Sequence, residues 1–408
     1  MKIGINGRFL VAKQTGVQRA AFNLVKALIQ LDTKNQYVIF TSKDQINRPI
    51  WQRSNVKVIG SDLGPEGSWK NNWWEQFTLP RLAKQEKIDI LCSPANMAPI
   101  LYKKPSVLFI YDLCFVVNPQ WYSYSFRTIY NLLIPRLAKK AARVITSSNN
   151  SRNDLLKFCG ISSEKVNIVY LAADEIFSRP AIENKLRQNM LALNSKSNDN
   201  KQIILYVGSL EPRKNIKNLL AAYELMREER PELSAKLILI GCESPLFAKT
   251  GLKIDKFKED IEFKGFVDDI MLREYYNQAT VVAYPSIYEG FGLPPLEAMA
   301  TGTPVITSYS SSLPEVVGNA AIMIDPFNVT QLKDALINVL ANSSLQEKMR
   351  ESGFTQAAKF NWSKVARDTL TVFYELADDP SHTQGETKFI SMAQWQELED
   401  LGKKVITI

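Results

Sequence analysis

Two short segments in the second half of the chain combine charged side chains with glycines where parallel strands are expected to end. The first is YVGSLEPRKNI (206–216), in which an apolar strand ends at Gly208 and a short loop carries Arg213 and Lys214. A helix is expected to begin near Asn215, and two cations at a helix N-terminus suit a phosphate or diphosphate. A surface loop with two solvated charges is the alternative interpretation.

The second segment is YPSIYEGFGLPPLEAMATGTPVITS (284–308), which places a glycine loop before a short helix. Glycines let backbone amides approach a ligand closely, and the helix N-terminus adds a partial positive charge. Pro295 is expected at the first helical position. Glu289 then lies in the loop and Glu297 in the first helical turn, where carboxylates can accept hydrogen bonds from sugar and ribose hydroxyls. The alternative interpretations are that Glu289 is a solvated loop residue and that Glu297 compensates the helix dipole.

The histidine and cysteine content of the chain excludes several kinds of catalytic and metal site. Among 408 residues the one histidine is His382, so a zinc site with several histidine ligands is excluded, and a Ser–His–Asp triad would need this residue. No two of the four cysteines form a CxxC pair, and no secretory leader is recognised, so we expect reduced core thiols in a cytosolic protein. The sequence contains no uncharged apolar run of 18 residues, so no membrane span is predicted. The cysteines are Cys92, Cys114, Cys159 and Cys242.

The net charge of +8 is unevenly distributed. Residues 1–180 contain 25 Lys and Arg against 12 Asp and Glu, a balance of +13, and residues 181–408 have a balance of −5. The first half is therefore expected to meet something anionic, such as nucleic acid, a membrane surface or a lipid phosphate. Solvation of helix faces by Lys and Arg explains the charge equally well.

Short apolar runs alternate with amphipathic segments through both halves, a pattern typical of parallel sheets covered by helices. This predicts two doubly wound α/β domains whose ligands bind beyond the carboxyl ends of the strands. Strands are expected at 2–6, 36–41, 56–60, 88–93, 106–112, 143–148, 201–210, 235–241, 260–266, 279–286 and 304–308. Helices are expected at 17–31, 73–85, around Pro135, and at 216–229, 270–278, 296–301, 331–341 and 363–377.

The E-x7-E spacing from Glu289 to Glu297 closely resembles that of retaining family 4 glycosyltransferases. Matching segments in the second half are GSLEPRKN, GFVDDIMLREYYNQA and SSLPEVVGNAAIMIDP, and in the first half TGVQRAAFNLVKAL, DILCSPANMAP and ITSSNNSRNDLL. The resemblance covers roughly 1–377 and implies the GT-B fold, two Rossmann-like doubly wound parallel-sheet domains facing across a cleft. It implies an acceptor-side domain at 1–180, a donor domain at 181–358, a helix at 359–378 packing back on the first domain, and a tail of unknown role at 379–408.

The resemblance also assigns roles to individual residues. Arg213 and Lys214 would hold the donor diphosphate, Glu289 the sugar hydroxyls and Glu297 the ribose. Gly16 would let the first loop approach the diphosphate. The backbones of the remaining donor-binding positions would line the base, sugar and phosphates, and these positions are Gly208, Val267, Gly290, Phe291, Gly292 and Leu293.

One position departs from the family pattern. The family usually has a His–Asp pair after the fourth or fifth strand, with the histidine near the reacting face of the sugar, whereas this chain has Tyr111 and Asp112. A tyrosine can still form a hydrogen bond through its hydroxyl, but it is longer and has a pKa of about 10.

The resemblance, which extends to bacterial mannosyltransferases of polysaccharide assembly, implies transfer of a hexose with retained configuration. The first expectation is mannose from GDP-mannose, passed to a glycan or lipid-linked saccharide, at the inner face of a membrane. No obligatory metal is expected, because Asp268 and Asp269 are interpreted as a surface pair. A catalytically impaired sugar-nucleotide binder is the main alternative. An NAD enzyme lacks its GxGxxG motif, and a nucleic-acid binder lacks a basic repeat or recognition module.

Overall fold

The computed structural model describes residues 1–12, 15–65, 68–178, 201–243 and 256–378. Its chain divides into two compact units. Unit 1 consists of Met1–Pro119, Tyr124–Leu171 and the helix that begins at Trp362, and unit 2 consists of Ala172–Asn361 together with Gln120–Ser123. Residues 179–200, where the donor domain expected at 181–358 begins, lie outside the described residues, as does the tail expected at 379–408.

Unit 1 is built on a seven-stranded parallel sheet in the order β3-β2-β1-β4-β5-β6-β7. Its strands are nearly continuous apolar runs because helices cover parallel sheets on both faces. The strands are β1 Lys2–Asn6, β2 Gln36–Ser42, β3 Val56–Ser61, β4 Ile90–Ser93, β5 Ser106–Phe109, β6 Arg143–Thr146 and β7 Val166–Ile168. The helices are α1 Gly16–Leu31, α2 Trp69–Trp73, α3 Leu79–Gln85, α4 Cys114–Val117, α5 Tyr124–Lys140, α6 Asn149–Asp154 and α14 Trp362–Asp378.

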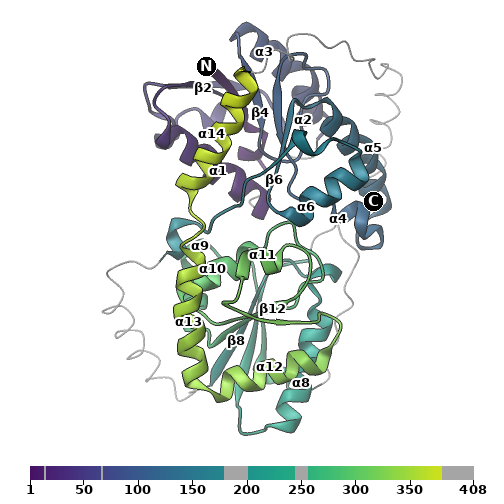
Figure 1. The fold of residues 1–408 in the computed structure, drawn as a ribbon, viewed down its shortest axis with the longest axis vertical. Helices are drawn as coiled ribbons and strands as arrows, with labels where there is room; N and C mark the ends of the chain where they lie inside the picture. Colours follow the sequence, from purple (N-terminus) through teal and green to yellow (C-terminus); the bar gives the residue numbers. More distant parts are fainter. Residues whose placement is uncertain (13–14, 66–67, 179–200, 244–255, 379–408) are drawn as a thin grey trace. The chain divides into compact units, whose positions relative to one another are not determined.

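Helix α14 belongs to unit 1 although it follows unit 2 in the sequence. It packs along α1, and the two helices are drawn side by side in Figure 1. Val365, Leu370 and Phe373 lie on its buried face. Outside this face, the Tyr374 hydroxyl accepts a hydrogen bond from the Asn35 side chain at 2.8 Å.

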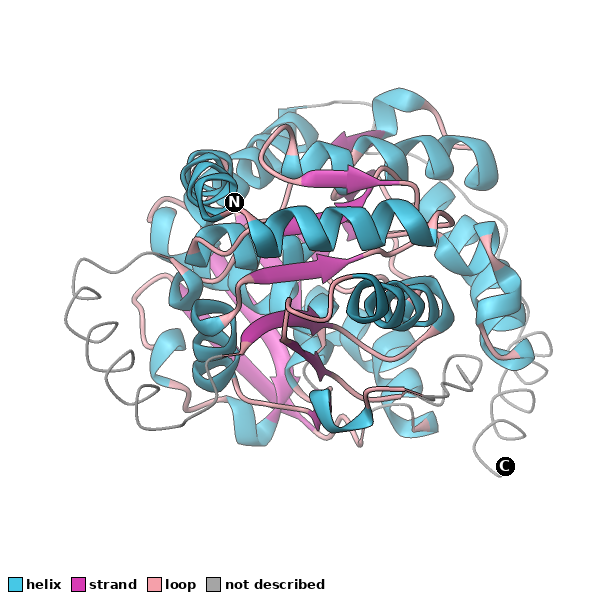
Figure 2. Cartoon of the chain, turned by 90° about the horizontal axis from the view of Figure 1, so that it is seen from below, coloured by secondary structure: helices cyan, strands magenta, loops and turns pink. Residues whose placement is uncertain are grey.

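Unit 2 has a six-stranded parallel sheet in the order β10-β9-β8-β11-β12-β13. Figure 2 shows strands flanked by helices on both sides. The strands are β8 Gln202–Val207, β9 Ala235–Ile240, β10 Ile261–Gly265, β11 Val281–Tyr284, β12 Val305–Ser308 and β13 Ile322–Ile324. The helices are α8 Ile216–Glu229, α9 Asp269–Gln278, α10 Leu293–Thr301, α11 Leu313–Val317, α12 Val329–Ala341 and α13 Ser343–Ala357.

Both sheets have the strand order of a doubly wound Rossmann-like domain, which confirms the predicted fold class. Two expectations were wrong in detail. Cys242 is exposed instead of lying in the core, because it follows the last residues of β9 in a loop. The helix expected at 73–85 begins earlier, at Trp69, and continues from α2 through a π-helical segment, Trp74–Thr78, into α3.

Candidate donor site at the strand ends of unit 2

The candidate site in unit 2 lies where the strand order reverses. Strands β8 and β11 are neighbours, and each is followed by a loop that leads into a helix at the carboxyl edge of the sheet. The β8 loop carries Arg213 and Lys214 in a short 3₁₀ turn, and the β11 loop carries Glu289. Crevices outside the carboxyl ends of strands at such a switch point are where open α/β sheets bind ligands.

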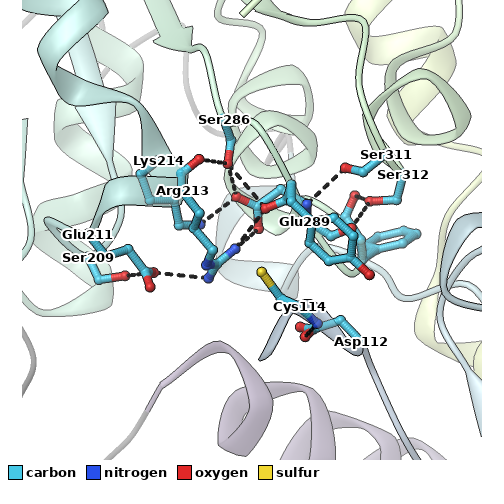
Figure 3. A network of polar contacts seen from close by, with 12 residues as sticks. Asp112, Cys114, Ser209, Glu211, Arg213, Lys214, Ser286, Glu289, Ser311 and Ser312 are labelled. Carbon is cyan, nitrogen blue, oxygen red and sulfur yellow. Dashed lines mark hydrogen bonds and ion pairs between the residues drawn. The ribbon is translucent and has the colours of Figure 1, made fainter. Parts of the chain in front are cut away.

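The structure brings Arg213, Lys214 and Glu289 together as a buried ion cluster, here called the Glu289 triad. The Arg213 Nη1 lies 2.8 Å from the Glu289 Oε2, and the Lys214 Nζ lies 2.7 Å from the Glu289 Oε1. Figure 3 shows both cations converging on the one carboxylate. The side chains are only 7 to 15% exposed, so the charges are poorly screened by water.

Further side chains hold the triad in place, and the sequence motifs did not single them out. The Tyr284 hydroxyl donates to the Glu289 carboxylate at 2.9 Å, and the Ser286 hydroxyl donates to the same oxygen. Glu211 forms a second ion pair with Arg213 at 3.0 Å. Two features of the sequence could have indicated these residues: Tyr284 ends a strand, and Glu211 lies close to Arg213 and Lys214 in the chain. From the next loop, Ser311 and Ser312 bond the backbone around Glu289.

Burial and neighbouring charge act in opposite directions on the Glu289 carboxyl. Burial alone would raise its pKa, but the charges of Arg213 and Lys214 outweigh this and lower the pKa to about 2. Burial and the charge of Arg213 lower the pKa of Lys214, and Glu289 opposes this shift. The cluster is therefore a pre-assembled set of charges whose cations have protein carboxylates as partners.

The depressed pKa of Glu289 predicts a loss of stability in acid. Because the folded pKa of about 2 lies below the ordinary value of 4.5, ionised Glu289 contributes stability above about pH 4.5 that is lost as the pH falls toward 2. The contribution is at most about 3 kcal/mol. We expect the free energy of unfolding, measured in urea at each pH, to fall more steeply between these values in the wild type than in Glu289→Gln. Parallel curves would show that this carboxylate does not titrate as expected.

The loop and helix after Glu289 are arranged differently from the sequence expectation. Helix α10 begins at Leu293 with Gly292 as its N-cap, so Pro295 is not the first helical residue and Glu297 lies in the second turn. Gly292 has φ +109°, where a Cβ would lie 2.8 Å from the Leu313 side chain, so glycine is required there.

The other donor-binding positions of unit 2 lie along the same edge of the sheet. The Glu297 carboxylate is buried and accepts a hydrogen bond from the Tyr276 hydroxyl at 3.0 Å. Gly290 and Phe291 are buried in the loop between Glu289 and α10. Gly208 directly follows β8, and Val267 follows β10, two strands from β8. Asn215 is the N-cap of α8, but its side chain donates to the carbonyls of Pro285 and Pro326 instead of capping the helix.

Three predicted site residues belong to unit 1. Gly16 is the exposed first residue of α1, and a Cβ added there would meet nothing within 4 Å. Asp112 accepts a hydrogen bond from the Cys114 amide at 2.9 Å. Tyr111 is buried, its hydroxyl donates to the Pro94 carbonyl at 2.8 Å, and burial raises its pKa well above the ordinary range. The Tyr111 hydroxyl is therefore neutral, and it forms its hydrogen bond within unit 1.

Each of the two units matches the model of a known protein family. Residues 14–175 match the family model described as Glycosyltransferase Family 4, and residues 192–356 match the one described as Glycosyl transferases group 1.

Among curated proteins, the O-antigen chain mannosyltransferase B of Escherichia coli is 33% identical over 238 residues, 57% of this chain and 60% of that protein. The serotype-specific mannosyltransferase WbdA of Escherichia coli is 25% identical over 304 residues, 72% of this chain and 37% of that protein. The MMP alpha-(1->4)-mannosyltransferase of Mycolicibacterium hassiacum is 29% identical over 245 residues, 58% of this chain and 55% of that protein. The matches thus span less than two thirds of these relatives.

Solved structures share the fold at low identity. The sucrose-phosphate synthase of Thermosynechococcus elongatus aligns with a TM-score of 0.69 and 19% identity, over 92% of this chain and 98% of that chain. Anabaena HepE in complex with UDP-glucose aligns with a TM-score of 0.66 and 17% identity, over 92% of this chain and 100% of that chain. With one family model matching each unit and this shared architecture, the chain belongs to the family 4 glycosyltransferases and has the GT-B fold.

Proposed function

We propose that the protein is a retaining glycosyltransferase that moves a hexose, mannose from GDP-mannose in the first instance, to a glycan or lipid-linked saccharide. The observation that carries this proposal is the Glu289 triad at the switch point of unit 2. Arg213 and Lys214 would bind the donor diphosphate there, and Glu289 would accept hydrogen bonds from the sugar. The mannosyltransferase names of the curated relatives support the choice of sugar.

In the proposed reaction the bond from the sugar's anomeric carbon to the diphosphate oxygen breaks. The acceptor oxygen forms its bond on the same face, and the acceptor's proton passes to the departing phosphate. No protein base is required, so catalysis comes from stabilising the charge of the leaving diphosphate and from positioning the two substrates. Among the described residues no group of three or more His, Cys, Asp and Glu could hold a metal ion. Arg213 and Lys214 are proposed to supply the charge, and undiminished transfer in EDTA would support this.

A thermal-shift screen with GDP-, UDP-, dTDP- and ADP-sugars tests donor binding, because a ligand that binds the folded state raises its apparent stability. One nucleotide series is expected to raise the melting temperature of the wild type. A flat response to every nucleotide sugar at millimolar concentration would contradict the proposal.

The second candidate function is binding of a sugar nucleotide without turnover, which the environment of Tyr111 favours. The buried hydroxyl bonds the Pro94 carbonyl, so it does not replace the imidazole that related enzymes present at this position. Donor binding without donor consumption, with turnover gained in Tyr111→His, would establish this candidate. Consumption of the donor by the wild type would dismiss it.

Unit 1 is proposed to act at the inner, cytoplasmic face of a membrane. Helix α5 contains four Lys and Arg and no acidic residue, and Arg127 lies over the exposed Tyr124 ring at 5.0 Å. The exposed Trp69 and Trp73 add aromatic surface in the same unit. The described residues contain no helix that is both long and apolar enough to cross a bilayer.

We therefore expect salt-sensitive binding to vesicles that contain phosphatidylglycerol. Sedimentation with these vesicles should fall severalfold between about 50 mM and about 500 mM NaCl, because salt screens exposed charges. Arg127→Glu should weaken sedimentation at low salt, whereas Lys348→Glu on unit 2 should not. Binding that is unaffected by salt would contradict an electrostatic attachment.

A further inference from the structure

Strand β10 is the last strand on one side of the unit 2 sheet. In the described part of the chain it pairs with β9 and has no strand on its other side. An edge strand leaves a row of backbone N–H and C=O groups unpaired, and this row is a template for a strand from another chain. The β10 edge is therefore a candidate contact surface.

Four large apolar side chains are exposed on this strand and directly after it. Phe263 lies in β10, Phe266 in the loop that follows, and Ile270 and Met271 in the first turn of α9. Their exposed fractions are 44 to 69%. Single exposed apolar residues are ordinary, but four within nine positions are typical of a surface that contacts a protein or a membrane.

The charge around these apolar residues distinguishes a membrane from a protein as the partner. Residues 258–274 contain six Asp and Glu against three Lys and Arg. The surface of an anionic membrane attracts Lys and Arg, so it would repel this acidic segment. A protein surface fits better, and the charges on β10 indicate which protein.

Strand β10 has one acidic and one basic side chain, on either side of Phe263. Glu262 and Lys264 form an ion pair within the strand, with Oε2 and Nζ 2.5 Å apart. Their side chains are 32% and 37% exposed, so a charge on another molecule can reach them. If the strand lies antiparallel to a second copy of itself, Glu262 can face the partner's Lys264 on both sides of Phe263.

Twofold symmetry restricts the registers of such a pair. Opposite residues in an antiparallel pair are of the same hydrogen-bonding type, so the axis must pass a residue that faces its own copy. An axis at Glu262 or at Lys264 places like charges directly opposite, which is destabilising. An axis at Phe263 places two aromatic rings opposite each other and opposite charges on both sides, which is stabilising. The sequence of β10 is therefore complementary to itself in this register.

Protection of the edge is the alternative explanation for these residues. Lysines and bulges are common on edge strands, where they prevent association, and the pairing of β10 with β9 shifts register between Phe263 and Gly265. Protection explains Lys264 and the irregular pairing. It leaves the exposed apolar side chains at the same edge without a role.

We propose that the protein forms a twofold dimer through β10, with the two strands antiparallel around Phe263 and the two unit 2 sheets joined into one. Each Glu262 carboxylate then lies between Lys264 of its own strand and Lys264 of the partner subunit, in a network of four alternating charges. Because the same edge of both copies is used, the contact closes at two subunits. The inference does not depend on the proposed function.

The test is analytical ultracentrifugation of the full chain, in which the wild type is expected to dimerise at micromolar concentration. Lys264→Glu and Glu262→Lys, made singly, should each raise the dimer dissociation constant about 10-fold or more, because two cross-strand pairs per dimer become like-charged. Both substitutions together restore opposite charges and should return the constant to within about threefold of the wild type. Lys364→Glu is the matched control, because it breaks an exposed ion pair with Asp368 at 2.6 Å on α14, and it should dimerise normally.

A wild type that stays monomeric throughout the micromolar range would overturn the proposal and favour protection of the edge. A dimer that both single variants leave unchanged, or a double variant as weak as the single ones, would also overturn it. If a charge variant does not fold, Phe266→Ser decides, because Phe266 is exposed: it should weaken the dimer, and an unchanged dimer would contradict the contact. Binding of a monomeric wild type to phosphatidylglycerol vesicles that Phe266→Ser removes would assign this surface to a membrane and overturn the proposal.

Discussion

Arg213→Ala is expected to lower the rate of sugar transfer about 100- to 1,000-fold, the loss typical when one preorganised donor to a developing negative charge is removed. Arg213 is held at the carboxyl edge of the sheet by Glu289 at 2.8 Å and Glu211 at 3.0 Å, so its guanidinium is fixed before substrate binds. The measurement is initial-rate kinetics with saturating donor. The loss should fall mainly on kcat, since the charge on the diphosphate grows as the sugar departs.

Arg227→Ala is the matched control for this variant. Arg227 is also largely buried and pairs with Asp260 at 2.7 Å, so its removal should cost comparable stability. Asp260, however, precedes β10 and lies at the amino ends of the strands, the opposite edge of the sheet from the Glu289 triad. Transfer by Arg227→Ala at the wild-type rate is therefore expected. Equal losses in both variants would mean that Arg213 acts through folding alone.

Glu289→Ala is expected to lower the free energy of unfolding by about 3–5 kcal/mol, the usual cost of leaving a buried charge uncompensated. It removes the one carboxylate that both Arg213 and Lys214 contact, and it also removes the acceptor for Tyr284. Transfer should be lost as well, because the donor sugar loses its proposed hydrogen-bond acceptor. Urea unfolding at pH 7 measures the first effect and donor consumption the second.

Asp260→Ala provides the control for the carboxylate. Asp260 also bridges two cations, with its oxygens 2.6 Å from the Lys201 Nζ and 2.7 Å from the Arg227 Nη1, and it is similarly buried. We expect a comparable loss of stability with normal transfer in whatever fraction remains folded. Unchanged stability in Glu289→Ala would contradict the electrostatic role assigned to the triad.

The parts of the fold that followed from the sequence are those with long, regular patterns. Helices α1, α8 and α14 have buried faces at helical spacing, and the apolar strands are bounded by turn residues, so their positions were predicted within a few residues. Strands β7 and β13 have three residues each, too few to show a period, and both were missed. Helix α13 was also missed, because its few buried residues give a weak apolar stripe.

The site was predictable where one motif carries the chemistry and unpredictable where packing decides. Arg213, Lys214 and Glu289 stood out by residue type beside expected strand ends. Their contact depends on the pairing of β8 with β11, which no local pattern encodes. The same holds for Tyr111: its identity was visible in the sequence, but the bond from its hydroxyl to the Pro94 carbonyl required the packed interior of unit 1.

The central claim is that the Glu289 triad serves nucleotide-sugar chemistry, and the most direct measurement is the anomeric proton NMR signal of the donor during incubation with the protein. Wild-type protein and Arg227→Ala are compared with Arg213→Ala, each with GDP-mannose and then the other nucleotide sugars, in the presence of methyl α-mannoside. The account predicts that one donor is consumed, with release of its nucleoside diphosphate, by the first two proteins and at least about 100-fold more slowly by Arg213→Ala. No consumption of any donor by the wild type, or equal consumption by all three proteins, would contradict it.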